Sequence, residues 1–108
     1  MANRVAIVGI GQTYHKSNRP DVNMQEMVGE AVRAALEDAD LSIKDIEATF
    51  HSNMETFEAI YFPDHVMAAE MGGFGKPGLK VATGGTSGGS VVCEGFYMVA
   101  GGLHDVAM

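Results

Sequence analysis

The stretch Leu79-Lys80-Val81-Ala82-Thr83-Gly84-Gly85-Thr86-Ser87-Gly88-Gly89 is the most informative part of the sequence. Its first five residues predict a β-strand, and the apolar stripe from Ser90 to Ala100 predicts a helix directly after the glycines. A glycine-rich turn between a strand and a helix presents backbone N–H groups, and the helix dipole favours negative charge there. Such a turn can hold a phosphate or stabilise an oxyanion. The expected binding residues are Gly84, Gly85, Thr86 and Ser87.

Three other segments have the pattern of strands. Val5–Val8 is a continuous apolar run, which suits a strand covered on both faces, as in a parallel α/β sheet. Ala48–Phe50 and Asp105–Met108 are shorter candidates. Gly9 and Gly11 follow the first run, and we interpret them as a tight exit turn. A dinucleotide-binding fingerprint is disfavoured because no third glycine opens a helix.

Helical patterns lie between these strands. Apolar residues recur at the helical period from Met24 to Ala39, and Asp21 is the expected N-cap of that helix. Ser42 and Asp45 fit a capping box that opens a further short turn. Pro63 to Met71 predicts another helix, with the proline in its first turn. Alternating strands and helices define the α/β fold class.

Charge and composition exclude several functions. The 108 residues hold 7 Lys and Arg against 14 Asp and Glu, and a net charge of −7 argues against nucleic acid and polyanionic membrane surfaces. No apolar run approaches the roughly 20 residues of a membrane span. The single cysteine excludes a disulfide framework and a zinc site built on several thiolates. We therefore expect a cytoplasmic protein.

Other chemically active residues give weaker signals. His51, Asn53 and Glu55 stand two residues apart on a segment without a clear period, so no metal site is expected. Lys76 lies in a glycine-rich loop, where a solvated charge is a better interpretation than a phosphate ligand. Cys93 is expected to be a buried structural residue. A further group could line a bulky apolar pocket, although ordinary packing is favoured: Phe57, Tyr61, Phe62, Met67 and Met71.

Three segments resemble the amino-terminal part of the thiolase superfamily, especially the branch with sterol-carrier-protein-type and archaeal acetyl-CoA acetyltransferases. Val5 to Thr13 is similar to the opening strand of that family. Ala31 to Ile46 resembles its first helix and the cap that follows. Val81 to Ala107 resembles its nucleophile loop, the buried helix behind the loop and the next strand.

The resemblance implies a particular architecture. It implies the amino-terminal portion of an α-β-α-β-α sandwich with a mixed five-stranded sheet, and we expect that sheet to be incomplete at residue 108. Residues 1–108 would form part of the amino-terminal domain, without the carboxyl-terminal half. The family is usually homodimeric, and the strand from Leu79 to Thr83 would lie near the twofold interface. We expect the segment to be inactive in isolation, because the remaining catalytic motifs lie in the other half.

One departure from the family pattern concerns its chemistry. Gly85 occupies the position of the family's cysteine nucleophile, so no acyl-enzyme can form there. Cys93 lies eight residues further on, about 12 Å along a helix. Thr86 and Ser87 suit helix caps better than nucleophiles. The histidines match no catalytic position of the family: His15, His51, His65 and His104.

The resemblance leaves three functions open. The first is carbon–carbon bond cleavage or formation by acyl transfer between a β-ketoacyl-CoA and CoA. The second is a thiolase-like aldolase, a retro-aldol lyase acting on a β-hydroxyacyl-CoA. The resemblance implies a zinc-ribbon and OB-fold partner for either of these two. The third is a non-catalytic scaffold subunit. The first two use coenzyme A as substrate or product, need no permanently bound cofactor and belong to lipid metabolism.

Overall fold

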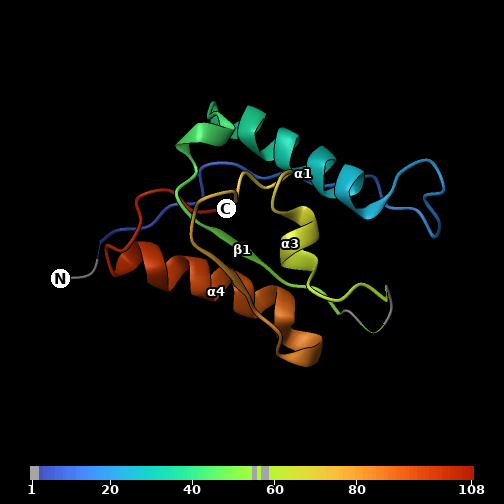
Figure 1. Cartoon of the computed structure of the whole chain (residues 1–108). Coiled ribbons are helices and arrows are strands. Elements are labelled where there is room, and N and C mark those ends of the chain that lie inside the picture. Colours follow the sequence, from blue (N-terminus) through green and yellow to red (C-terminus); the bar gives the residue numbers. More distant parts are fainter. Residues whose placement is uncertain (1–2, 55, 57–58) are drawn as a thin grey trace.

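The computed structural model describes residues 3–54, 56 and 59–108 (Figure 1). A short two-stranded sheet lies at the centre, with helices on both sides. The described helices and strands are, in chain order, α1 (Met24–Ala39), the 3₁₀ turn η1 (Ile43–Asp45), β1 (Thr49–His51), α3 (Pro63–Met67), β2 (Gly78–Lys80), the 3₁₀ turn η2 (Gly84–Thr86) and α4 (Ser87–Ala100).

The sheet consists of β1 and β2 in parallel. Phe50 lies opposite Leu79 in the register, and the Val81 N–H donates to the His51 carbonyl at 2.9 Å just beyond the paired residues. Both predicted strands are therefore confirmed, although each is only three residues long. The α/β fold class and the incomplete sheet agree with the expectation.

The other edge of β1 contacts the end of the chain. Ala48 and Ala107 form an isolated parallel bridge. The Met108 N–H donates to the Ala48 carbonyl at 3.0 Å, and the Phe50 N–H donates to the Met108 carbonyl at 2.7 Å. The predicted strand Asp105–Met108 is thus reduced to a bridge.

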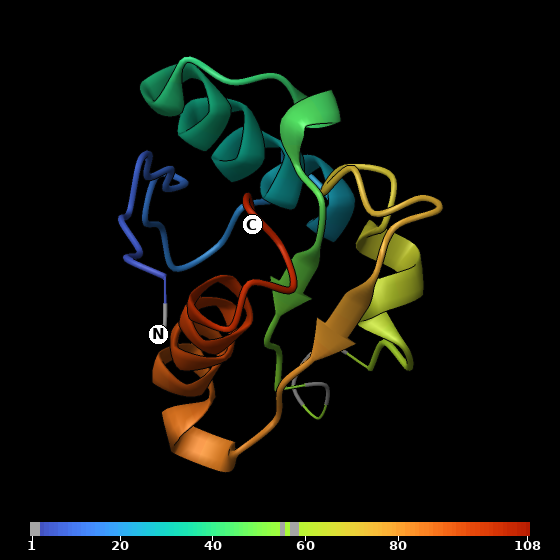
Figure 2. The same cartoon turned by 90° about the vertical axis from the view of Figure 1, so that its left-hand side faces the viewer.

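The layers follow from the apolar faces of the helices. Helix α4 packs on β1, α3 packs on β2, and α1 packs on α3. Figure 2 shows the strands between α4 and α3. The core cluster consists of Val32, Met67 and Met71, and other residues of the α1 stripe pack against it. The apolar residues that recur at the helical period therefore correctly predicted the side of α1 that faces the core.

The start of α1 corrects the predicted cap. Asn23, not Asp21, is the N-cap: its side chain accepts from the Glu26 N–H at 2.8 Å, and the Glu26 carboxylate accepts from the Asn23 N–H at 2.8 Å. Glu26 stands three residues after Asn23, where a capping box requires it, whereas Met24 stands three after Asp21. Asp21 instead binds the Arg19 guanidinium at 2.9 Å.

The predicted starts of two other helical segments are confirmed, but the predicted extent of Pro63–Met71 is not. The Ser42 N–H and hydroxyl both donate to the Asp45 carboxylate at 2.7 Å and fix the turn η1. Pro63 occupies the first turn of α3. That helix ends at Met67, and turns rather than helix continue to Met71.

The segment Val5–Val8 is not a strand, which corrects the sequence-based expectation. The bridge from Ala107 takes the edge of β1, and the amino-terminal segment packs on α1 instead. A methyl group added at Gly9 would lie 2.5 Å from the Ala35 carbonyl oxygen, and one added at Gly11 would collide with that of Ala31. The two glycines therefore permit close backbone packing, a role that the exit-turn interpretation missed.

Candidate functional site

The glycine-rich turn joins β2 to α4 and is closed by the side chain of Ser87. The Thr83 N–H donates to Ser87 Oγ at 2.8 Å, and Ser87 Oγ donates to the Gly84 carbonyl oxygen at 2.8 Å. Ser87 is buried, whereas Gly84 and Gly85 are exposed. The Ser87 hydroxyl thus ties the end of the turn to its start at Thr83 and Gly84, and it leaves the backbone of Gly84 and Gly85 open to solvent.

A second pair of hydroxyls ties the turn to the first turn of α4. Thr86 Oγ1 donates to the Thr83 carbonyl oxygen at 3.0 Å, and Thr83 Oγ1 lies 2.8 Å from Ser90 Oγ. Thr86 is the N-cap residue, but its side chain makes no capping hydrogen bond. Of the two residues expected as helix caps, Thr86 therefore occupies the cap position without a side-chain hydrogen bond, and Ser87 is the first residue of the helix.

The same contacts bear on whether either hydroxyl is a nucleophile. Thr86 and Ser87 both donate to oxygen atoms of the turn itself, and those partners are carbonyl and hydroxyl groups. Neither type of partner is a general base that would take the hydroxyl proton at neutral pH. The hydroxyls of Thr86 and Ser87 therefore hold the turn together.

The backbone conformation favours glycine at Gly84 but not at the other glycines of the turn. Gly84 has a φ of +65°, a conformation that favours glycine. Gly85, Gly88 and Gly89 have ordinary φ angles, and a methyl group added at any of them would meet no atom within 4 Å. At Gly85, therefore, local packing does not require the absence of a side chain.

The electrostatics of the turn come from the backbone. Helix α4 has 14 residues, and the first N–H groups of an α-helix have no partners within the helix; of these, the Ser87 N–H already donates to the Gly84 carbonyl oxygen. Those groups and the helix dipole favour an anion or a developing negative charge at this end. The arrangement is chemically suited to hold a carbonyl oxygen or a phosphate.

The cysteine and the lysine differ from their expected environments. Cys93 is exposed, so the prediction of a buried structural cysteine is wrong. Helix α4 covers β1 with only one side, and Val92 and Phe96 are exposed as well. Lys76 is not a purely solvated loop charge, because its Nζ donates to the Ile43 carbonyl oxygen at 3.0 Å.

Two groupings considered in the sequence, one of metal-ligating types and one of bulky apolar residues, each include a residue outside the described part of the chain. Glu55 and Phe57 lie outside the described residues, and no group of three His, Cys, Asp or Glu suited to a metal occurs within the described ones. Met67 and Met71 are buried in the core, as the packing interpretation predicted. Two aromatic residues proposed beside them, Tyr61 and Phe62, are exposed instead.

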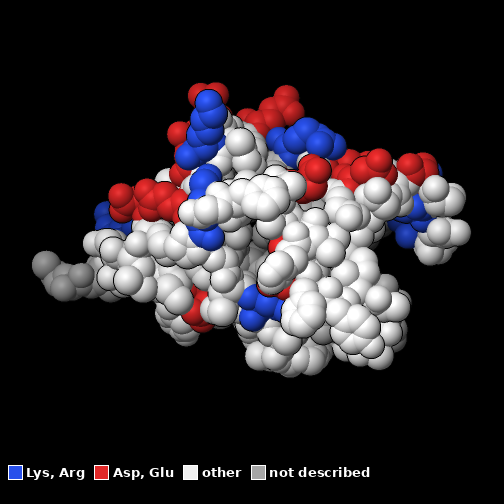
Figure 3. All heavy atoms as spheres, viewed as in Figure 1, with Lys and Arg blue, Asp and Glu red and all other residues white. Residues whose placement is uncertain are grey.

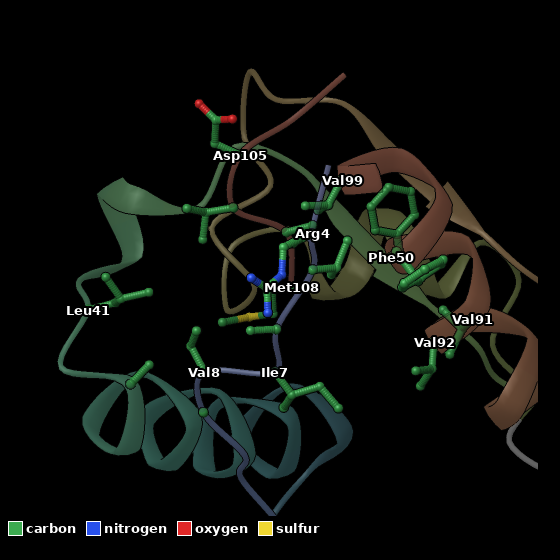
Figure 4. Close-up of a pocket in the computed structure, with 18 residues that line it drawn as sticks. Arg4, Ile7, Val8, Leu41, Phe50, Val91, Val92, Val99, Asp105 and Met108 are labelled. Carbon is green, nitrogen blue, oxygen red and sulfur yellow. The ribbon is translucent and has the colours of Figure 1, made fainter. Parts of the chain in front are cut away.

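Two cavities lie away from the turn. The larger, here called the α4 groove, has a volume of about 1000 Å³ between α4, the amino-terminal segment and the end of the chain (Figure 4). Its lining residues are Arg4–Gly9, Ala39, Leu41, Phe50, Val91, Val92, Gly95, Phe96, Val99 and Asp105–Met108. The smaller, of about 290 Å³, lies between the sheet and α3 and includes His51, Asp64 and His65. Neither is lined by Gly84–Ser87.

The carboxyl groups whose pKa values are shifted belong to hydrogen bonds that hold the fold together. Hydrogen bonds from the Arg19 guanidinium lower the pKa of Asp21 and of Glu30. The Ser42 hydroxyl lowers the pKa of Asp45. In Figure 3, Asp and Glu side chains gather along the α1 edge, and the surface over α4 and α3 is mostly uncharged. Among the described helices, none is long and apolar enough to cross a membrane.

The fold is that of part of a thiolase-like domain, as comparison with solved structures confirms. A priming β-ketosynthase from the R1128 polyketide biosynthetic pathway superposes with a TM-score of 0.63 and 24% identity over 78% of this chain and 25% of its own. No family model matches.

One relative with a curated description is similar to this chain in sequence. The acetyl-CoA acetyltransferase of Methanothermobacter thermautotrophicus is 31% identical over 107 residues, which are 96% of this chain and 27% of the relative. The two comparisons confirm the thiolase-superfamily resemblance, and the chain spans about a quarter of the length of each protein.

Proposed function

We propose that this chain is part of a thiolase-like subunit that acts on CoA thioesters. The reaction is cleavage or formation of a carbon–carbon bond by acyl transfer between a β-ketoacyl-CoA and CoA. The observation that carries the proposal is the strand–turn–helix from β2 through Gly84–Ser87 into α4, in a chain 31% identical to an acetyl-CoA acetyltransferase. Coenzyme A is a substrate or product, and no permanently bound cofactor is required.

In this proposal the turn binds the thioester. Its backbone N–H groups, at the amino-terminal end of α4, hold the carbonyl oxygen on which negative charge develops. Ser87 contributes indirectly, because its two hydrogen bonds fix the backbone of Thr83 and Gly84. A turn that is already closed needs little reorganisation when the oxyanion forms.

Gly85 determines how the acyl group moves. Because we place it where the family has its cysteine, the thiolate of free CoA attacks the β-keto carbonyl directly. The bond between the α and β carbons breaks, and its electron pair passes to the α carbon of the departing thioester as an enolate. A proton then reaches that carbon, giving two CoA thioesters. The exposed backbone at Gly85 leaves room for the incoming thiol.

A retro-aldol reaction is the second candidate. It needs a base for the β-hydroxyl proton and a pocket for the enolate oxygen, but no acyl-enzyme. The absence of a side chain at Gly85, together with the internal bonding of Thr86 and Ser87, favours a reaction of this kind. A zinc-ribbon and OB-fold subunit would be its partner. The third candidate is a non-catalytic scaffold subunit.

Two activity assays and a test for a stable complex, made on the protein purified with any associated chains, separate these functions. Cleavage of acetoacetyl-CoA that strictly requires free CoA supports acyl transfer. Cleavage of a β-hydroxyacyl-CoA to a carbonyl compound without CoA overturns acyl transfer in favour of the aldolase. Failure of both reactions, with a stable complex, leaves the scaffold function. The 108-residue chain alone is expected to turn over neither substrate.

A further inference from the structure

The segment from Thr83 to Ser90 is held in shape by its own hydroxyl groups. Four of its eight residues are glycine, and a methyl group added at any of them would meet no other part of the chain within 4 Å. The remaining four residues all carry a hydroxyl: Thr83, Thr86, Ser87 and Ser90. Glycine loses more conformational freedom on folding than any other residue, so a glycine-rich turn needs other interactions to order it. The hydrogen bonds of these four hydroxyls provide them.

Thr83 is the centre of this network. Its N–H donates to Ser87 Oγ at 2.8 Å. Thr86 Oγ1 lies 3.0 Å from both the carbonyl oxygen and Oγ1 of Thr83. Thr83 Oγ1 also lies 2.8 Å from Ser90 Oγ. The N–H, the carbonyl group and the hydroxyl of one residue therefore all contact side chains further along the same segment.

The hydrogen bond between Thr83 and Ser90 spans the whole turn, which joins β2 to α4 (Figure 2). Thr83 has φ −129° and ψ 32°, values of neither a strand nor a helix, and Ser90 lies in the first turn of α4. Ser87 ties together only Thr83, Gly84 and the start of the helix. The Thr83 hydroxyl thus makes a direct side-chain link from the end of the strand segment to the first turn of α4.

We propose that Thr83 is a positioning residue, whose hydroxyl holds the first turn of α4 in the orientation that stabilises an oxyanion. This inference rests on the proposed function, in which N–H groups at that end of α4 hold the carbonyl oxygen of a CoA thioester. Thr83 acts through Ser90 and Thr86 and does not itself contact the reacting atoms. Donors stabilise a transition state best when they are already oriented, because reorientation during the reaction loses part of the stabilisation.

Three substitutions separate the hydroxyl from the rest of the side chain. Thr83→Val keeps the shape and the N–H of the residue but removes its hydroxyl, and with it the bond to Ser90. Thr83→Ser keeps the hydroxyl and removes only a methyl group. Ser90→Ala removes the other end of the same bond. Because the two hydroxyls share that bond, the double variant Thr83→Val with Ser90→Ala is expected to lose no more activity than Thr83→Val alone.

Steady-state kinetics test the proposal on the protein purified with any associated chains, with either acetoacetyl-CoA plus CoA or a β-hydroxyacyl-CoA as substrate. We expect Thr83→Val and Ser90→Ala each to lower kcat about tenfold and to change KM less than about twofold, because the oxyanion forms only in the transition state. Thr83→Ser is expected to retain most of the activity. Thr13→Val, the same change in the amino-terminal segment, is the control and should have no effect. An unchanged kcat in Thr83→Val, or equal losses in Thr83→Val and Thr83→Ser, overturns the proposal.

Amide hydrogen exchange tests the turn without an activity assay. The Ser87 N–H donates to the Gly84 carbonyl oxygen, so it exchanges when the turn opens. We expect Thr83→Val and Ser90→Ala to speed this exchange about fivefold or more, and Thr83→Ser to leave it unchanged. Unchanged exchange in the first two variants overturns the positioning role even where activity falls. If the unmodified protein cleaves neither substrate, the proposed function fails, and the exchange rates alone decide whether the Thr83 hydroxyl holds the turn.

Discussion

The Ala35 carbonyl oxygen on α1 faces Gly9 so closely that a methyl group on Gly9 would stand 2.5 Å from it. The Cβ atom of Ala39, one turn further along α1, would lie 2.7 Å away. Small residues on both sides therefore allow the amino-terminal segment to run against the backbone of the helix. This packing holds the segment that forms one wall of the α4 groove.

Gly9→Ala is expected to destabilise the protein by about 1–3 kcal/mol, because the added methyl group overpacks this contact. Gly89→Ala is the matched control: Gly89 lies in α4, and a methyl group added there would meet no other part of the chain within 4 Å, so alanine is expected to be neutral or to stabilise by up to about 1 kcal/mol. Urea unfolding measures both changes. Equal effects of the two substitutions would contradict the close approach.

Arg19 links the loop before α1 to the helix through Asp21 and Glu30, at 2.9 and 2.8 Å. The pKa of each carboxyl group is lowered in the folded protein, so the stabilisation is fully present above the unfolded pKa and is lost as the pH falls through the lowered folded value. Arg19→Met is therefore expected to lower the melting temperature at pH 7. We expect the difference from the unmodified protein to shrink below about pH 4. A difference that grows on acidification would contradict the sign.

Asn23→Ala removes the cap of α1 and is expected to cost about 1 kcal/mol. Asn18→Ala makes the same chemical change at an exposed loop position and should have little effect. Chemical denaturation, with helix content followed by circular dichroism, gives both values. If Asp21→Ala alone produced the loss of helix, the assignment of Asn23 as the cap would fail.

Alanine substitutions at Gly72 and Gly75 distinguish the stability cost of backbone strain from that of a steric contact. Both have positive φ angles, of 69° and 71°, but a methyl group at Gly72 would lie 2.5 Å from the Ile43 side chain, whereas at Gly75 it would meet no atom within 4 Å. Gly75→Ala is expected to cost about 1–2 kcal/mol from backbone strain. Gly72→Ala should cost more, and unfolding free energies measure the difference. Equal losses would show that Ile43 moves aside without cost.

Gly85→Cys, made together with Cys93→Ser, tests whether the turn accepts a side chain. No atom lies within 4 Å of the added carbon, so the melting temperature should be unchanged. The introduced thiol should react with iodoacetamide as fast as an exposed cysteine in a denatured control. Gly11→Cys in the same background is the contrasting variant, because its side chain would collide with α1. If the Gly85→Cys protein were destabilised, or its thiol unreactive, the turn would have no room for a side chain at this position.

Local sequence patterns predicted the elements whose causes are local. The Ser42–Asp45 pair, the proline at the start of α3 and the apolar period of α1 all act within a few residues, and each is confirmed. The cap of α1 was missed because Asp21 and Asn23 are both good caps. The glutamate three residues after Asn23 was the signal that distinguished them.

Long-range relationships were harder to predict. Val5–Val8 has the composition of a strand, but Ala48, directly before β1, pairs with Ala107, which lies about 100 residues beyond Val5–Val8 along the chain. The exposure of Cys93 depends on which side of α4 covers β1, and α4 has apolar residues on both sides. The glycine-rich turn was predicted at its correct place, while the hydrogen bonds of Ser87 that close it became visible only in three dimensions.

The parallel pairing of β1 with β2 has a consequence for how the chain folds. Thr49 and Gly78 are partners although 28 residues separate them along the chain, so their pairing must first overcome the entropy of closing that crossover. Helix α1, with its local capping box, does not bear this cost and can form early. The central sheet is therefore expected to assemble late, after the helices that will cover it have begun to form.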